Sequence, residues 1–159
     1  MILPFLQERL HFSTLCGTIR GEKQLCRKKE AFAVQEPFMT REERKRLARS
    51  YLGRVVHIGI DRPVGYVHHK EQYDLIYPIN YGYIPGVLGG DAEELDVYLL
   101  GVDEPVEEYD AEIIGVVWRE DDVEDKLVGA PRGMRYTADE VARAVEFQEL
   151  HHVSHVEVL

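Results

Sequence analysis

Residues 95–100 read LDVYLL, a short apolar run broken by a single carboxylate. Side chains alternate between the two faces of a strand, so Asp96 should point away from Leu95 and Val97 and toward a cleft. Four more runs of this kind are bounded by Gly, Pro or acidic turn residues. We therefore expect strands at residues 54–60, 74–77, 95–100, 113–118 and 126–130, with a short terminal strand at 155–158.

Two helices are predicted from capping boxes, in which a Thr hydroxyl and the carboxylate three residues later satisfy free backbone amides. Thr40 with Glu43 predicts a polar helix to about residue 51, and Thr137 with Glu140 predicts a helix to about residue 150. Five short strands followed by a helix indicate a mainly β fold with flanking helices. The expected architecture is a small closed or partly closed β-barrel, of which the five-stranded OB type is one example.

The N-terminal part of the chain lacks this pattern. Residues 1–38 show neither a helical nor a strand period, so we expect a flexible or loosely docked extension before a barrel domain at 39–159 with a C-terminal helix. The opening apolar run is too short for a signal peptide and leads directly into Glu8 and Arg9. Two cysteines make neither a zinc site nor a disulfide framework, and a cytoplasmic location is therefore expected.

Charge is distributed unevenly along the chain. The whole chain carries a formal charge of −10, yet residues 1–50 hold 11 Lys or Arg against 6 Asp or Glu. The acidic remainder repels nucleic acid and anionic membranes, so we expect neither as a partner. It attracts divalent cations instead, because carboxylate oxygen suits their hard charge.

Two acidic clusters interrupt the predicted strands. The first is GGDAEELD at residues 89–96, where Asp91 and Glu93 precede Asp96, and the second is EDDVED at residues 120–125. Carboxylates from two loops at one barrel mouth can share cations. The alternative for either cluster taken alone is a solvated, charged turn.

Residues 77–86 read YPINYGYIPG and place three tyrosines among Asn, Pro and Gly. A phenol is a neutral hydrogen-bond donor, which suits a phosphate oxygen in a site crowded with carboxylates. The alternative is an aromatic β-turn that packs into the core, and this is the interpretation we favour for Tyr83.

Three blocks, YPINYGYIPG, GDAEELDVYLLG and DDVEDKLVGAP, resemble the soluble (family I) inorganic pyrophosphatases in their order and spacing. The resemblance covers roughly residues 53–131 and implies an OB-type barrel with flanking helices and a homo-oligomer. It also implies Mg²⁺ ions that bridge aspartates and pyrophosphate, and a metal-activated water that hydrolyses pyrophosphate to two phosphates.

The same resemblance implies roles for single residues. Glu93 would orient the attacking water, and Lys126 and Tyr81 would act in catalysis and bind the phosphates. Arg62 is our candidate for the phosphate-binding residues that are missing upstream. Four carboxylates correspond to the metal ligands of the family: Asp91, Asp96, Asp121 and Glu124. The correspondence of Asp121 and Glu124 requires that the second loop is two residues shorter here than in the family.

Several positions depart from the family pattern. Glu93 replaces an aspartate, Ala92 a glycine and Glu94 a proline, and Gly59 stands where the family has a glutamate. No lysine follows Lys126, so the Tyr-Lys pair near the family's C-terminus has no counterpart.

We therefore expect a Mg²⁺-dependent inorganic pyrophosphatase and keep two alternatives open. The first is a hydrolase of another diphosphate, such as a nucleotide, because several phosphate-binding cations are missing. The second is a catalytically degenerate barrel that serves as a binding module. Retention of Asp91, Asp96, Lys126 and Tyr81 together argues against this second alternative.

Overall fold

A computed structural model describes residues 38–159, which lie within one compact unit. In this part of the chain the helices are α1 (Arg41–Arg49) and α2 (Ala138–Glu149). No helix among these residues is long and apolar enough to cross a membrane. The strands, in chain order, are β1 (Val55–Arg62), β2 (Val67–His69), β3 (Asp74–Ile76), β4 (Asn80–Leu88), β5 (Glu94–Leu99), β6 (Glu108–Arg119), β7 (Lys126–Ala130) and β8 (Ser154–Val158).

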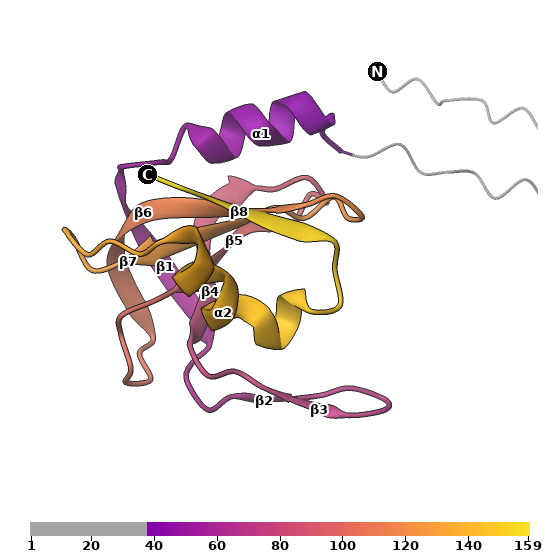
Figure 1. Ribbon diagram of the computed structural model, residues 1–159, viewed down its shortest axis with the longest axis vertical. Coiled ribbons are helices and arrows are strands. Elements are labelled where there is room, and N and C mark those ends of the chain that lie inside the picture. Colours follow the sequence, from indigo (N-terminus) through magenta and orange to yellow (C-terminus); the bar gives the residue numbers. More distant parts are fainter. Residues whose placement is uncertain (1–37) are drawn as a thin grey trace, which may run out of the picture. The chain divides into compact units, whose positions relative to one another are not determined.

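Five strands close into a barrel in the order β1-β4-β5-β7-β6, because β6 pairs with β7 and also with β1. Neighbouring strands are antiparallel except β5 and β7, which run parallel. The long β6 also pairs with β8 near its end. The hairpin of β2 and β3 forms a separate sheet that extends away from the barrel (Figure 1).

Apolar side chains form two clusters on opposite faces of the barrel wall. One joins Tyr98 and Val128 on the outer face to Val141 and Val145 of α2. Val97, the chain neighbour of Tyr98, belongs to the other cluster, as expected for a strand that is buried on both faces. This other cluster fills the barrel and takes residues from every barrel strand, including Ile58, Ile84, Val97, Ile113 and Leu127.

Both predicted capping boxes are confirmed. The hydroxyl of Thr40 accepts from the amide of Glu43, that of Thr137 accepts from the amide of Glu140, and each glutamate accepts from its cap residue in return. Each box satisfies amides that the first helical turn leaves free, which fixes where the helix begins. Ala48 of α1 joins the cluster inside the barrel, so this polar helix packs against the fold through its one small apolar face.

The predicted mainly β fold with flanking helices is confirmed, but one barrel strand differs from the expectation. The run at 74–77 forms β3 of the outlying hairpin, whereas β4 supplies the fifth barrel strand from the tyrosine-rich stretch. This strand was hard to predict from the sequence because it contains Gly82, Pro85 and Gly86, and glycine and proline normally weaken or end strands. The expectation for residues 1–38 lies, apart from Phe38, outside the described residues.

Candidate active site

The candidate site is a pocket of about 500 Å³ at one end of the barrel. It is bordered by residues from the end of β1, from β4, from the β4–β5 loop with the start of β5, and from the β6–β7 loop. Six of its lining side chains are carboxylates, against a single basic side chain. The lining residues are Asp61, Arg62, Tyr83, Asp91, Glu93, Glu94, Asp96 and Glu124.

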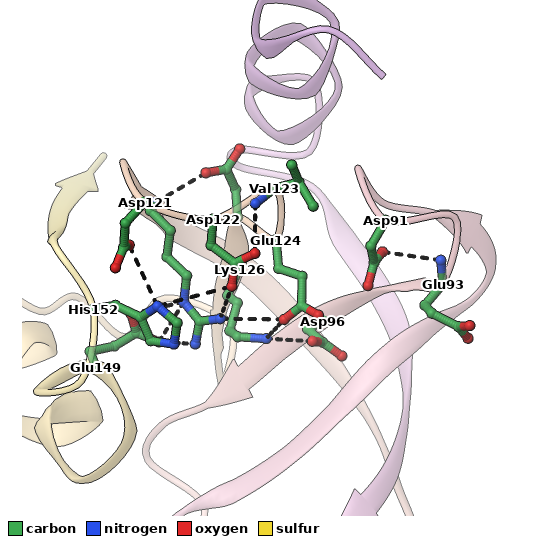
Figure 2. Close-up of polar contacts among 12 residues, drawn as sticks. Asp91, Glu93, Asp96, Asp121, Asp122, Val123, Glu124, Lys126, Glu149 and His152 are labelled. Carbon is green, nitrogen blue, oxygen red and sulfur yellow. Dashed lines mark hydrogen bonds and ion pairs between the residues drawn. The ribbon is translucent and has the colours of Figure 1, made fainter. Parts of the chain in front are cut away.

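Asp96 stands at the centre of this arrangement. Leu95 and Val97 on either side of it are buried in the barrel, so strand alternation turns the Asp96 carboxylate toward the pocket, as the sequence predicted. One of its oxygens, Oδ2, lies 2.5 Å from the hydroxyl of Tyr81 and 2.5 Å from Nζ of Lys126, and both groups donate to it. Figure 2 shows Asp96 and Lys126 side by side between the two acidic loops.

Lys126 is a buried cation with a complete set of partners. Its side chain is 1% exposed, and Nζ also donates to the Tyr81 hydroxyl at 2.8 Å and to Glu124 at 3.2 Å. A buried ammonium is stable only when it is paired in this way. Burial, and next the charge of Asp96, raise the pKa of Tyr81 well above its ordinary 10.0. Tyr81 therefore remains a protonated donor that holds Asp96 in place.

Arg62 supplies the one basic side chain in the pocket lining. Its Nη1 donates to the Tyr77 hydroxyl at 2.5 Å, and its guanidinium lies over the rings of Tyr77 and Tyr81 at 5.4 and 5.1 Å from their centroids. These contacts hold a partly exposed guanidinium against an aromatic surface, an arrangement that suits the binding of phosphate oxygens. Sequence analysis missed the neighbouring Asp61, which resembled a turn residue; it lines the pocket, and burial raises its pKa.

The first acidic loop adopts an unusual backbone path. Ala92 has a φ of 69°, a left-handed conformation that costs a non-glycine residue about 1–2 kcal/mol. The carboxylate of Asp91 accepts from the amide of Glu93 at 3.0 Å, and that of Glu94 accepts from the amide of Gly86 at 2.8 Å. These contacts hold the loop from which Asp91 and Glu93 line the pocket.

The two metal ligands predicted in the second acidic loop lie in different places. Glu124 lines the pocket, whereas Asp121 does not, and the nearest basic atom to its carboxylate is Nδ1 of His152 at 3.5 Å. In Figure 2, Asp121 and His152 lie on the side away from Asp91. The structure thus brings Asp91, Glu93 and Glu124 together with Asp96 and leaves Asp121 apart.

Arg119 is a buried guanidinium that sequence analysis did not single out. Its side chain is 2% exposed and pairs with Glu149 of α2 at 2.7 Å, with Asp122 at 3.1 Å and with Glu124 at 3.3 Å. Glu149 in turn accepts from the buried hydroxyl of Tyr98 at 2.6 Å. Glu124 is therefore fixed by two internal cations, Arg119 and Lys126.

Tyr83 does not have the role that we favoured from the sequence. It lines the pocket and belongs to neither apolar cluster, so it is not a core residue of a turn. Tyr81 and Tyr83 lie two residues apart on β4 and therefore share a face of this strand. Tyr81 belongs to the cluster beneath α2 and is buried, whereas Tyr83 lies outside that cluster and is only partly covered.

The side chains that line the pocket indicate which kind of metal ion it suits. Among residues 38–159, no three His, Cys, Asp or Glu side chains are placed close enough together to hold a metal ion. The chemistry of the lining nevertheless fits a hard divalent cation, because Asp61, Asp91, Glu93 and Asp96 offer carboxylate oxygen and Arg62 is the one basic residue that lines the pocket with them.

Comparison with known proteins identifies the family. The sequence profile described as inorganic pyrophosphatase matches residues 57–155. The chain belongs to the inorganic pyrophosphatase family, whose members are hydrolases that act on phosphoanhydrides. Among curated protein sequences, none matches the chain.

One of two similar solved structures supports the same fold. An inorganic pyrophosphatase from Ehrlichia chaffeensis is 15% identical, with a TM-score of 0.53 over 67% of this chain and 87% of that one. One from Neisseria gonorrhoeae is 21% identical, with a TM-score of 0.45 over 67% of this chain and 80% of that one. The Ehrlichia chaffeensis structure supports the OB-type barrel. The family match starts at residue 57, after the end of α1.

Proposed function

We propose that the protein hydrolyses inorganic pyrophosphate to two phosphates in a reaction that depends on Mg²⁺. The observation that carries this proposal is the pocket of about 500 Å³, in which carboxylates from two loops surround Asp96. Family membership supports the choice of a phosphoanhydride substrate. Pyrophosphate is strongly anionic, so a pocket of this charge can bind it only together with cations.

The proposed metal ligands are the carboxylates that line the pocket, with Asp96 and Asp91 at their centre and Glu124 and Asp61 at the sides. When bound, Mg²⁺ activates water for attack and neutralises charge on the phosphates. Asp121 is left out of this set, because its carboxylate is directed toward His152. We thus replace one predicted ligand, Asp121, with Asp61.

The remaining residues act through position and charge. Glu93 lines the pocket from the first loop, and we assign to its carboxylate the roles of orienting the attacking water and accepting its proton. Arg62 binds phosphate oxygens with a guanidinium that the tyrosine rings hold in place. Lys126 and Tyr81 donate to Asp96 and fix the direction of its free oxygen, and the charge of Lys126 partly offsets that of the pocket.

A second candidate function is hydrolysis of another diphosphate, such as that of a nucleotide. The observation in its favour is that Arg62 is the only basic residue in the lining, so the site has few direct contacts with a small, highly charged anion. A substrate with a nucleoside attached would gain binding energy from contacts outside the pocket. Homo-oligomer formation remains a prediction of the family resemblance, and a cytoplasmic location remains a prediction from the two cysteines.

The test is phosphate release from pyrophosphate and from a panel of nucleoside di- and triphosphates, each with Mg²⁺ and with a chelator. Wild type is compared with Asp96→Asn and with Asp103→Asn, an exposed aspartate outside the pocket. Release from pyrophosphate that requires Mg²⁺, is lost in Asp96→Asn and persists in Asp103→Asn supports the proposal. Release from nucleotides alone supports the second candidate, and no release from any substrate would reduce the barrel to a binding module.

A further inference from the structure

The ring of Tyr83, which lines the pocket, lies against Gly59. The two residues are cross-strand partners, Gly59 on β1 and Tyr83 on β4. A Cβ atom placed on Gly59 would lie 3.2 Å from Cζ and 3.3 Å from the hydroxyl oxygen of Tyr83. The phenol thus occupies the space into which any side chain at position 59 would project.

The hydroxyl of Tyr83 differs from those of the three tyrosines packed beside the site. Tyr77 accepts from Arg62, Tyr81 donates to Asp96, and Tyr98 donates to Glu149. The Tyr83 hydroxyl has no hydrogen-bond partner among the described residues, and it is not a buried unsatisfied group because the side chain borders an open pocket. It is therefore a donor that is free to bind something within the pocket.

We propose that Tyr83 binds the diphosphate substrate through a hydrogen bond from its hydroxyl to a phosphate oxygen, and that Gly59 is required to admit the ring. This inference rests on the proposed function and assigns a substrate-binding residue to the same site. A phenol donates to an anion without adding charge. A carboxylate at position 59 would instead add one more negative charge to a lining that already has six.

The central experiment measures binding apart from catalysis. Calorimetry with imidodiphosphate, a non-hydrolysable analogue, is carried out with Mg²⁺ on wild type, Tyr83→Phe and Tyr109→Phe. Tyr109 is a matched control because it lies on a barrel strand and does not line the pocket. Tyr83→Phe should weaken binding and raise KM for pyrophosphate by about tenfold, the typical effect of one hydrogen bond to a charged group. The melting temperature and the behaviour of Tyr109→Phe should match wild type.

Gly59→Ala provides a second variant that leaves the hydroxyl in the protein. The added methyl group would lie 3.2 Å from the ring, so the ring must shift by a few tenths of an ångström and carry its hydroxyl with it. We expect weaker binding in Gly59→Ala alone and no further loss when it is added to Tyr83→Phe, since no hydroxyl is then left to displace.

The outcomes separate this inference from the proposed function. If wild type binds imidodiphosphate and Tyr83→Phe binds it equally well, the role of Tyr83 is refuted while the proposed function stands. Additive losses in the double variant would refute the role of Gly59 in positioning the ring. If wild type neither binds the analogue nor hydrolyses pyrophosphate, both the inference and the proposed function are wrong.

Discussion

Replacing Arg44 on α1 with methionine should both destabilise the protein and loosen its two acidic loops. Nη1 of Arg44 donates to Oδ2 of Asp125 at 2.7 Å, and the two side chains are only 8% and 6% exposed. The other carboxylate oxygen of Asp125 accepts from the amide of Arg119. The stem of Arg44 also packs against the first loop, since a Cβ on Gly90 would lie 2.2 Å from its Cδ. One side chain therefore contacts both loops that border the pocket.

The expected loss follows from the burial of this ion pair. Removing one partner of a buried pair leaves the other charge without compensation and typically costs about 3–5 kcal/mol of the free energy of unfolding. Methionine keeps most of the apolar stem, so the loss should come mainly from the stranded carboxylate of Asp125. By contrast, Arg41 on the same helix forms an exposed pair with Glu120, and Arg41→Met should cost at most about 1 kcal/mol.

The loss of stability in Arg44→Met should depend on pH. Burial raises the pKa of Asp125 above its ordinary 3.8, and the charge of Arg44 opposes this rise. In Arg44→Met the pKa of Asp125 should rise further. A carboxyl with a raised folded-state pKa binds its proton more tightly in the folded state, so stability declines as pH rises from about 3.8 through the folded-state pKa. The penalty of the variant should therefore be largest near neutral pH and shrink in acid.

Urea unfolding of wild type, Arg44→Met and Arg41→Met at several pH values measures this penalty. Adding Asp125→Asn to Arg44→Met should recover part of the loss, because the stranded charge is then removed. The reasoning is refuted if Arg44→Met costs no more than Arg41→Met, or if its penalty grows as the pH falls.

Four further predictions concern the site and the chain around it. Asp96→Asn should abolish hydrolysis in a steady-state assay, because an amide lacks the charge that holds cations. Glu93→Gln should lower kcat by about 10²–10⁴-fold with little change in KM, the signature of a lost general base. Glu124→Gln should weaken Mg²⁺ binding in a calorimetric titration, whereas Asp121→Asn should leave it unchanged. A chain that begins at residue 39 should keep wild-type activity and melting temperature, because every element of the barrel lies beyond that point.

Much of the fold could be predicted because its strands carry strong local signals. β1, β5 and β7 contain apolar runs, and two capping boxes mark the helices. The apolar run at 113–118 marks only the second half of β6, which begins at Glu108 with a mostly polar segment. β4 could not be predicted in this way, since its position is set by pairing with β1 and β5 on either side rather than by its own composition. The run at 74–77 has the better local strand signal, yet only the tertiary pairing shows that it lies outside the barrel.

The site was predictable where the sequence motif and strand alternation agree. Asp96 is such a residue, because its place between two core residues determines which way it points. The buried ion pairs of Arg44 and Arg119 could not be predicted, since an arginine is recognisable as buried only once its distant partners are known. Tyr83 was misjudged for a related reason: its ring lies against Gly59 of another strand, a contact that only the tertiary pairing reveals.

The distribution of charge around Glu124 explains why the second loop was the hardest part to predict. Counting back from Lys126 leaves the place of Asp121 open to a shift of two residues, and we exclude Asp121 from the proposed ligands because of its contact with His152. On one side of Glu124, the cations Arg119 and Lys126 neutralise Glu149, Asp122 and part of Asp96. On the other side, Asp61, Asp91 and Glu93 share the pocket lining with a single basic residue, Arg62. Asp61, Asp91 and Glu93 in the pocket thus have less basic compensation than Asp122 and Glu149, which favours the binding of a divalent cation in the pocket.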